Sequence, residues 1–544
     1  MDKILNWLRQ DRRYITLIKS GLLAVLPVLC CMVYCAAQGK TIGQVYLPGS
    51  EWNDELFYFK QVEGIVNYGF PQGYFGFNES HALKLSFAAW SPVLVFPWIL
   101  WGLLFGWNLM SPILCNIALM TICCFLFGWL VKPAWRQLGV LALLFVLYTP
   151  FVRYMLSGMP EVICFSSLIL FYGLAINYLN RDKTWKLILL FLLSGVMTLM
   201  RPYLMLFLLL PVFFWVKKSR LKGAVGSALV LGLVLGLYAC IKYYLGAAYF
   251  DPLFFTDWVE AFFDRGLFGG IHFTLGKLYY MGLNFMRHTI QGFRSGLASG
   301  AFFGGYLVMM GILLFQSIRD FVVFRRLRKA DVSVEASKRD DSLYLKELGK
   351  RLVIEVHMAL CFVAMLFALL LMYKLTEGSK HLLTFMAAGI FVIALMETRF
   401  LKKAVLMGVI FAYLYSYMAV DPYDYQVPFV TEERSSQVQA WKGAFSQNMQ
   451  LVKKDVPNYG NDVLWAFSDV TENGSVNTAW QLLYGLPEGF GISCCKVDYV
   501  LQNIASLKCR YLVSPAGGEI DSLCREAGYR EIWGDETMVL YQLY

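Results

Sequence analysis

The chain has 544 residues, of which 58% are hydrophobic and only 16% are charged, with a formal net charge of +10. Soluble globular proteins carry about 25% charged residues, so this composition excludes an ordinary soluble protein and indicates repeated membrane crossings. The positive charge does not indicate a nucleic-acid partner, because the basic residues lie in short clusters between apolar runs.

A membrane-spanning helix needs roughly 20 mostly apolar residues. The sequence predicts about eleven such spans, at 14–37, 108–130, 138–152, 162–178, 185–200, 203–216, 224–245, 298–318, 352–373, 381–398 and 404–420. A further apolar run, 86–107, contains Pro92 and Pro97 and four tryptophans. This run is predicted to lie at the outer interface or to dip partway into the bilayer, and the sequence leaves open whether it spans the membrane.

Basic clusters orient these spans, because cytoplasmic loops of membrane proteins are enriched in Lys and Arg. The clusters begin at Lys3, Lys132, Arg181, Lys217 and Arg399, and a longer basic stretch covers 319–351. Placing all of them inside predicts an integral, multi-pass protein of the cell or plasma membrane with a cytoplasmic N-terminus. The 319–351 stretch is predicted to be a cytoplasmic linker that contacts anionic lipid.

Two domains are predicted. Residues 1–420 form a transmembrane module with outer loops at about 38–85 and 246–297, and residues 421–544 form an extracytoplasmic α/β domain. Strands are expected at 463–469, 492–497, 509–515 and 538–544, with helices at 497–508 and 519–529 between them. The loop at 246–297 interleaves acidic and aromatic residues, and is predicted either to lie as amphipathic helices on the outer leaflet or simply to cover the bundle.

The first outer loop carries adjacent acids, Asp54 and Glu55, followed by Phe57, Tyr58, Val62, Ile65 and Val66 at near-helical spacing. This pattern predicts a short amphipathic helix on the membrane with the acids at its N-terminal end, where the helix dipole keeps a carboxylate ionised and able to act as a base. The alternative is a purely structural role, in which Asn53 or Asp54 caps the helix.

The residues Trp52-Asn53-Asp54-Glu55 with Tyr58 resemble the W-x-D-E-x-x-Y stretch in the first external loop of GT-C fold glycosyltransferases, especially the protein mannosyltransferase and aminoarabinose transferase group. The resemblance implies a polytopic GT-C-like fold and an enzyme that moves a sugar from a polyprenyl-phosphate carrier to an acceptor at the outer membrane face. It also implies that Asp54 is the catalytic base and that Glu55 supports it.

Two more stretches extend the resemblance in the same order, over roughly 10–215. The run YTPFVRYMLSGMPEVICF resembles the family's second outer turn, and places Glu161 where an acid faces the sugar-phosphate. The run SGVMTLMRPYLMLFLLLP resembles the G-x-x-x-x-x-R-P pattern, and places Arg201 where a guanidinium can bind phosphate. The structural alternatives are a helix-start acid for Glu161 and an arginine that extends to the interface for Arg201.

The sequence also departs from the family. The prolines expected after the acidic motif are missing, and Glu79 and His81 stand there instead, either as weak candidate ligands for a divalent metal or as polar loop contacts. Lys380 and His381 stand where an Arg-Tyr pair is expected, and join Arg153 as candidate donor-phosphate residues. No cofactor is certain, and a divalent metal ion is left open.

These observations predict a membrane glycosyltransferase with an inverting mechanism. Its predicted partners are a polyprenyl-phosphate sugar donor, a glycan, lipid or protein acceptor, and membrane lipids, with no nucleic acid. Two alternatives share the bundle and the basic loops: a transporter or flippase of lipid-linked saccharides, and a non-catalytic assembly protein of the cell envelope. The sequence does not indicate the sugar, the acceptor or the oligomeric state.

Overall fold

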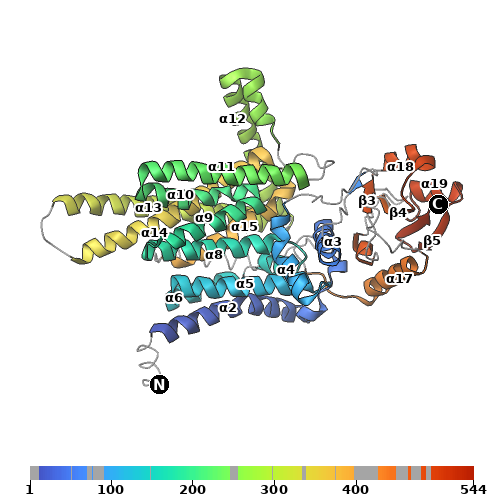
Figure 1. The fold of residues 1–544 in the computed structure, drawn as a ribbon, viewed down its shortest axis with the longest axis horizontal. Helices are drawn as coiled ribbons and strands as arrows, with labels where there is room; N and C mark the ends of the chain where they lie inside the picture. Colours follow the sequence, from blue (N-terminus) through green and yellow to red (C-terminus); the bar gives the residue numbers. More distant parts are fainter. Residues whose placement is uncertain are drawn as a thin grey trace.

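The structure is a computed structural model that describes residues 12–50, 52–69, 76–77, 91–147, 149–245, 255–296, 298–333, 339–373, 375–396, 427–448, 463–466, 480–485, 492–495 and 497–543. Packed helices form a bundle, and a smaller unit with a β-sheet lies at one end of it (Figure 1). The helix α3 lies between the two. Among the described residues, six helices are long and apolar enough to cross a membrane. The chain is a multi-pass membrane protein.

The six long helices coincide with predicted spans. They are α2 (Arg12–Ala37), α5 (Ser111–Val131), α8 (Glu161–Asn180), α11 (Arg220–Leu245), α13 (Ala298–Ser333) and α14 (Arg339–Met372). Shorter apolar helices occupy other predicted spans, at α9 (Thr184–Met200) and α15 (Leu375–Leu395). The predicted span 404–420 lies outside the described residues, so the number of spans stays a prediction.

Two of the predicted spans contain a proline in a first helical turn. The stretch 138–152 contains α6 (Trp135–Leu147) and α7 (Thr149–Met155), and residue 148 between them lies outside the described residues. The stretch 203–216 begins after Arg201 as the 3₁₀ helix η4 (Pro202–Leu208) and continues as α10 (Leu209–Lys218). A proline is tolerated in a first helical turn but cannot donate the hydrogen bond that a helix interior needs, which explains why a new helix begins at Pro202.

The basic stretch 319–351 is largely helical and not an open linker. The helices α13 and α14 continue through it up to Ser333 and from Arg339, and they project beyond the other helices (Figure 1). Lys, Arg, Leu and Ala favour helix, which explains why the spans extend into this polar sequence. The apolar run 86–107 contains only η3 (Pro92–Val95) and the ten-residue α4 (Phe96–Phe105) among its described residues.

The helix α12 (Asp257–Arg294) stands crosswise to the packed helices in Figure 1. It is kinked at Gly266, whose φ of 70° is open to glycine because it has no Cβ. Beyond the kink, Leu267, Ile271, Leu275 and Tyr279 are exposed at four-residue spacing. This apolar stripe is suited to contact with the lipid interface, as the amphipathic alternative for this loop predicts.

The sheet has six strands in the order β1-β3-β2-β4-β6-β5. The four predicted strands are present as β2 (Val463–Ala466), β3 (Ile492–Cys495), β4 (Tyr511–Pro515) and β6 (Met538–Gln542). Two strands were not predicted, β1 (Gly76–Phe77) and β5 (Arg530–Gly534). The strands β3, β2 and β4 are parallel, whereas β6 is antiparallel to β4 and β5.

The helices α18 (Val497–Asn503) and α19 (Glu519–Glu526) lie within the predicted helical stretches, and α17 (Glu432–Asn448) was not predicted.

The strand β1 belongs to the loop predicted over about 38–85, and it pairs in parallel with β3 through Gly76 and Phe77. Backbone bonds tie the same loop to the start of the C-terminal region. Tyr46 N–H donates to Pro428 O at 2.9 Å, and Val430 N–H donates to Gln44 O at 2.8 Å. This loop and the C-terminal region are therefore joined by hydrogen bonds.

Candidate functional site

The acidic pair lies in the first turn of α3 (Asn53–Tyr68), and Trp52 occupies the N-cap position. Asn53 and Asp54 are therefore inside the helix, and the alternative that one of them caps it is wrong. The helix is not laid on a surface either, because Leu56 to Val62 are all buried. It packs against α4 and against the 3₁₀ helix η5 (Trp480–Gly485) of the C-terminal region. Its N-terminal dipole favours both carboxylates.

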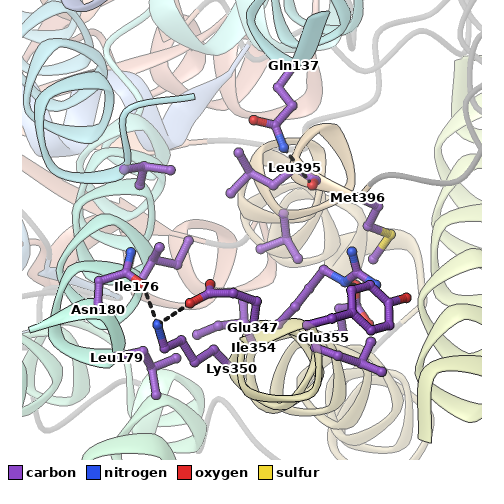
Figure 2. Close-up of a pocket in the computed structure, with 15 residues that line it drawn as sticks. Gln137, Ile176, Leu179, Asn180, Glu347, Lys350, Ile354, Glu355, Leu395 and Met396 are labelled. Carbon is purple, nitrogen blue, oxygen red and sulfur yellow. Dashed lines mark hydrogen bonds and ion pairs between the residues drawn. The ribbon is translucent and has the colours of Figure 1, made fainter. Parts of the chain in front are cut away.

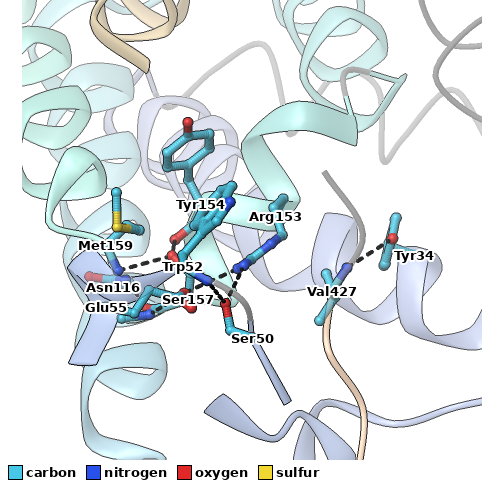
Figure 3. Close-up of polar contacts among 11 residues, drawn as sticks. Tyr34, Ser50, Trp52, Glu55, Asn116, Arg153, Tyr154, Ser157, Met159 and Val427 are labelled. Atoms are coloured by element: carbon cyan, nitrogen blue, oxygen red, sulfur yellow. Dashed lines mark hydrogen bonds and ion pairs between the residues drawn. The ribbon is translucent and has the colours of Figure 1, made fainter. Parts of the chain in front are cut away.

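Glu55 is fully buried and is fixed by partners from α7 and from the turn between α7 and α8. Its Oε1 accepts from Gly158 N–H at 3.0 Å and from Arg153 Nη1 at 3.2 Å (Figure 3). Gly158 permits this approach, because a Cβ there would lie 3.2 Å from the Glu55 Cβ. Asp54, the neighbouring acid, is only partly buried. The pair thus divides into one fully buried carboxylate and one that is partly exposed.

Arg153 is 1% exposed, and each of its identified contacts comes from the loop or turn around Glu55. Its Nη2 donates to Ser50 Oγ at 3.0 Å, and its guanidinium lies 3.7 Å from the centre of the Trp52 ring. Figure 3 shows Trp52, Ser50 and Glu55 gathered around this side chain. A guanidinium over an aromatic face gains a cation–π attraction in addition to its hydrogen bonds.

A second buried ion pair joins Glu161 to Arg201. Glu161 is the first residue of α8, and Arg201 follows α9 in extended backbone, which the next residue, Pro202, favours. Arg201 Nη2 donates to Glu161 Oε1 at 2.6 Å, and neither residue is exposed. Arg201 therefore does not extend to an exposed interface. A buried pair of this kind is costly to assemble, and removing one partner leaves an uncompensated charge.

Tyr203 and His381 complete this second cluster. Arg201 Nη1 lies 3.0 Å from Tyr203 Oη and 3.1 Å from His381 Nδ1, and those two atoms are 3.1 Å apart. His381 belongs to α15 and is 2% exposed. Of the predicted donor-binding residues, the structure thus brings Glu161, Arg201 and His381 together. Lys380 precedes His381 in α15, and its side chain lies outside the described residues.

Tyr58 connects the acidic helix to the second cluster. It lies one helical turn after Asp54 and is buried. Burial raises the pKa of Tyr58 well above its ordinary value, the negative charges of Asp54 and Glu161 raise it further, and the Arg201 guanidinium opposes them. One phenol therefore lies within electrostatic reach of Asp54, Glu161 and Arg201. These groups share one region at the α3 end of the bundle.

The C-terminal region contributes Tyr484, from η5, to the same place. Its ring lies 5.5 Å from Phe59 of α3 between centroids. Burial raises the pKa of Tyr484, the Glu55 carboxylate raises it further, and Arg153 opposes this. The Tyr484 hydroxyl, Glu55 Oε2 and Glu161 Oε2 are buried and have no hydrogen-bond partner among the described residues. Buried polar atoms without a hydrogen-bond partner can form hydrogen bonds with polar groups of a ligand.

Sequence patterns did not identify Tyr203, Ser50 and Tyr484 as site residues. Tyr203 had a local signal, since it follows the Arg-Pro pair directly. Tyr484 had none, because its contact with α3 depends on how the C-terminal region packs. The candidate metal ligands Glu79 and His81 lie outside the described residues. Across the residues that are described, no group of three or more His, Cys, Asp or Glu gathers to hold a metal ion.

No protein-family model matches this chain, and no curated protein sequence matches it. Several solved structures resemble it distantly. The oligosaccharyltransferase of Archaeoglobus fulgidus in the apo form is 12% identical, with a TM-score of 0.44 over 94% of this chain and 70% of that one. The archaeal oligosaccharyltransferase AglB from the same organism, in complex with an inhibitory peptide and a dolichol-phosphate, is 12% identical, with a TM-score of 0.47 over 96% and 73%.

ArnT from Cupriavidus metallidurans, bound to undecaprenyl phosphate, is 9% identical, with a TM-score of 0.41 over 96% of this chain and 97% of that chain.

Proposed function

We propose that this chain is a membrane glycosyltransferase of the GT-C type, which moves a sugar from a polyprenyl-phosphate donor to an acceptor hydroxyl and inverts the anomeric configuration. One observation carries the proposal. The partly exposed Asp54 shares a region with two buried ion pairs, Glu55–Arg153 and Glu161–Arg201, which come from segments far apart in the sequence. Buried ion pairs beside a partly exposed acid support the assignment of this region as an active site.

Asp54 would act as the general base. A base must reach the acceptor proton, and Asp54 is the accessible member of the acidic pair. It would take the proton from the acceptor hydroxyl as the hydroxyl oxygen bonds to the anomeric carbon. The bond between that carbon and the phosphate oxygen breaks, and polyprenyl phosphate leaves with the electron pair. Glu55 would support Asp54 by fixing the start of α3 to the second outer turn.

Arg201, Tyr203 and His381 would stabilise the leaving phosphate, because Arg201 Nη1, the Tyr203 hydroxyl and His381 Nδ1 already lie within hydrogen-bond distance of one another. Glu161 Oε2, which is buried without a described partner, would accept a hydrogen bond from a sugar hydroxyl. Arg153 is assigned to holding Glu55, since its identified contacts are to Glu55, Ser50 and Trp52.

The test uses the purified full-length protein and a panel of labelled polyprenyl-phosphate sugars, with donor loss and polyprenyl-phosphate release as readouts. We expect Asp54→Asn to slow transfer by about 10²–10⁴-fold, as loss of a general base does. Asp182→Asn is the matched control, because Asp182 is exposed and forms a surface ion pair with Lys218. Normal transfer by Asp54→Asn would remove Asp54 from the mechanism, and no donor consumption by the wild type would contradict the proposal.

One observation supports the alternative function of a transporter. Asp320 and Glu355 are buried within the long helices α13 and α14, and charge inside a bundle is a feature of transport pathways. The same assay distinguishes the two functions, because a transporter would move the donor across a vesicle membrane without breaking its sugar–phosphate bond.

A further inference from the structure

Asn116 is a buried amide that links the apolar run 86–107 to the turn after α7. It lies in α5 and is fully buried, as is Trp98 of α4. Asn116 Oδ1 accepts from Trp98 Nε1 at 2.9 Å, and Asn116 Nδ2 donates to the carbonyl oxygen of Ser157 at 3.1 Å. Burying an amide in an apolar bundle is costly unless it is hydrogen-bonded, and these two bonds offset that cost.

The orientation of this amide is fixed by its two partners. An indole N–H can only donate a hydrogen bond, and a backbone carbonyl can only accept one. The amide oxygen must therefore face Trp98, and the amide nitrogen must face Ser157, because exchanging the two atoms would break both bonds. Asn116 thus accepts one hydrogen bond from α4 and donates another to the turn.

The carbonyl of Ser157 and the N–H of Gly158 belong to one peptide unit. That N–H donates to Glu55 Oε1 at 3.0 Å. Asn116 and Glu55 therefore bind opposite ends of the same peptide dipole, and hydrogen bonds in such a series strengthen one another where the dielectric constant is low. Figure 3 shows Asn116, Ser157 and Glu55 together at this turn. A continuous series of hydrogen bonds connects Trp98 to the Glu55 carboxylate.

The turn also has hydrogen bonds of its own. Ser157 Oγ donates to Tyr154 O at 2.7 Å, and Met159 N–H donates to Ser157 Oγ at 3.1 Å. Those bonds lie within the turn and define its shape. Asn116, in contrast, connects the turn to another helix, and so bears on where the turn lies relative to the bundle.

A second tryptophan of the run 86–107 contacts α3 directly. Trp107 Nε1 donates to Phe59 O at 3.0 Å, and the two rings stack with centroids 5.4 Å apart. The rings of Trp98 and Trp107 lie 6.1 Å apart between centroids. The run therefore supports α3 through one tryptophan and, through Trp98 and Asn116, supports the turn that binds the start of α3.

We propose that Asn116, oriented by Trp98, is a positioning residue for the base Asp54. It fixes the Gly158 peptide, this peptide fixes Glu55, and Glu55 fixes the first turn of α3, in which Asp54 lies. Asn116 acts through Glu55 and contacts no substrate, and the inference rests on the proposed transferase function. A misplaced base slows the chemical step, so loss of Asn116 should lower kcat and leave the KM for donor unchanged.

Asn116→Leu tests the proposal, because leucine has a similar volume and can form neither side-chain hydrogen bond. Hydrogen exchange of the full-length protein in detergent reports on the Gly158 N–H, and the transferase assay gives kcat and KM. We expect about tenfold faster exchange in the segment Ser157–Met159, the change that loss of one buried hydrogen bond can produce. We also expect kcat to fall about tenfold with an unchanged KM for donor.

Asn177→Leu is the matched control. Asn177 Nδ2 donates to Leu130 O at 2.8 Å, so this substitution also removes an amide that bonds to a backbone carbonyl. Asn177 lies about 24 Å from Glu161 along α8. Its neighbour Ile176 lines a cavity of about 340 Å³ at that end of the bundle (Figure 2). The control should change neither the exchange of Gly158 nor kcat.

Trp98→Phe is a second variant in case Asn116→Leu fails to fold, because it keeps an aromatic ring and removes the N–H donor. It should change exchange and kcat in the same directions, by about threefold. Unchanged exchange of Gly158 in both variants would overturn the support of Glu55 by Asn116, and faster exchange with an unchanged kcat would overturn the positioning role. Faster exchange in a protein whose wild type consumes no donor would overturn the transferase function, whereas the support of Glu55 would stand.

Discussion

The carboxylate of Glu55 accepts a hydrogen bond from the backbone N–H of Gly158 at 3.0 Å, across 103 residues of sequence. This bond and the Arg153 contact join the start of α3 to the turn that leads into Glu161. The accessible acid, Asp54, is thereby fixed relative to the Glu161–Arg201 pair. The geometry of the proposed site thus depends on how closely these two backbone segments approach.

Gly158→Ala should disturb this approach. The new Cβ would lie 3.2 Å from Glu55 Cβ and 3.4 Å from its backbone oxygen, so one of the two segments must shift by a few tenths of an ångström. We expect slower sugar transfer with a modest loss of thermal stability, measured by donor consumption and by unfolding in detergent. Gly139→Ala in α6 is the control, because nothing lies within 4 Å of its Cβ position. Equal activity of the two variants would argue against tight coupling at Gly158.

Arg153→Met should destabilise the protein by leaving Glu55 buried without its cation. Breaking a buried pair in this way typically costs about 3–5 kcal/mol. The double variant Arg153→Met with Glu55→Gln should recover part of that loss, because it removes both charges. Thermal unfolding of the wild type, both single variants and the double variant gives the coupling energy. Additive effects of the two substitutions would mean that the 3.2 Å contact between Arg153 and Glu55 contributes nothing to stability.

Arg201→Lys should keep the positive charge but lose the planar guanidinium with its several N–H donors. The arginine reaches Glu161 with one nitrogen and Tyr203 and His381 with another, which a single ammonium cannot reproduce. If this cluster holds the donor phosphate, the variant should show a higher KM for donor and a lower kcat. Unchanged kinetic constants would exclude a role for the guanidinium in donor binding.

The C-terminal region should lose stability in acid. Burial would raise the pKa of Asp521, but hydrogen bonds from Tyr541, Gly517 N–H and Arg525 outweigh it and lower the pKa below its ordinary 3.8. A lowered pKa means that the folded state favours the carboxylate. Its stabilisation is therefore fully present above about pH 4 and is lost as the pH falls through the lowered value.

Hydrogen exchange of the full-length protein can measure this effect. Asp521→Asn should reduce protection of β4 and β6 at pH 7, and the difference from the wild type should shrink as the pH falls below 4. Asp498→Asn, at an exposed position in α18 of the same region, is the control. A difference that is independent of pH would point to a packing defect and not to the lost charge.

Much of the fold follows from local patterns. Apolar runs predicted the long helices, and β-branched and aromatic runs predicted β2, β3, β4 and β6. The strands β1 and β5 were missed because Gly76–Phe77 is only two residues long and Arg530–Gly534 is polar and largely exposed. Such segments become strands only because a neighbouring strand pairs with them.

The site was predictable in composition but not in its pairing. Motifs in the first outer loop, the second outer turn and the Arg-Pro run singled out Asp54, Glu161 and Arg201. Nothing local showed that Glu55 would bond to Arg153, because 98 residues separate them and the contact depends on the packed bundle. The same holds for His381, which lies 180 residues from Arg201.

The pairing of Gly76 and Phe77 with β3 also bears on the order in which the protein matures. Because a ribosome releases the N-terminal part first, this short strand emerges long before Ile492–Cys495 is synthesised. The loop that carries Asp54 and Glu55 therefore lacks its pairing with β3 until nearly the whole polypeptide has been synthesised. A chain shortened before β3 would lack the strand with which Gly76 and Phe77 pair, and the loop would lose this connection to the C-terminal region.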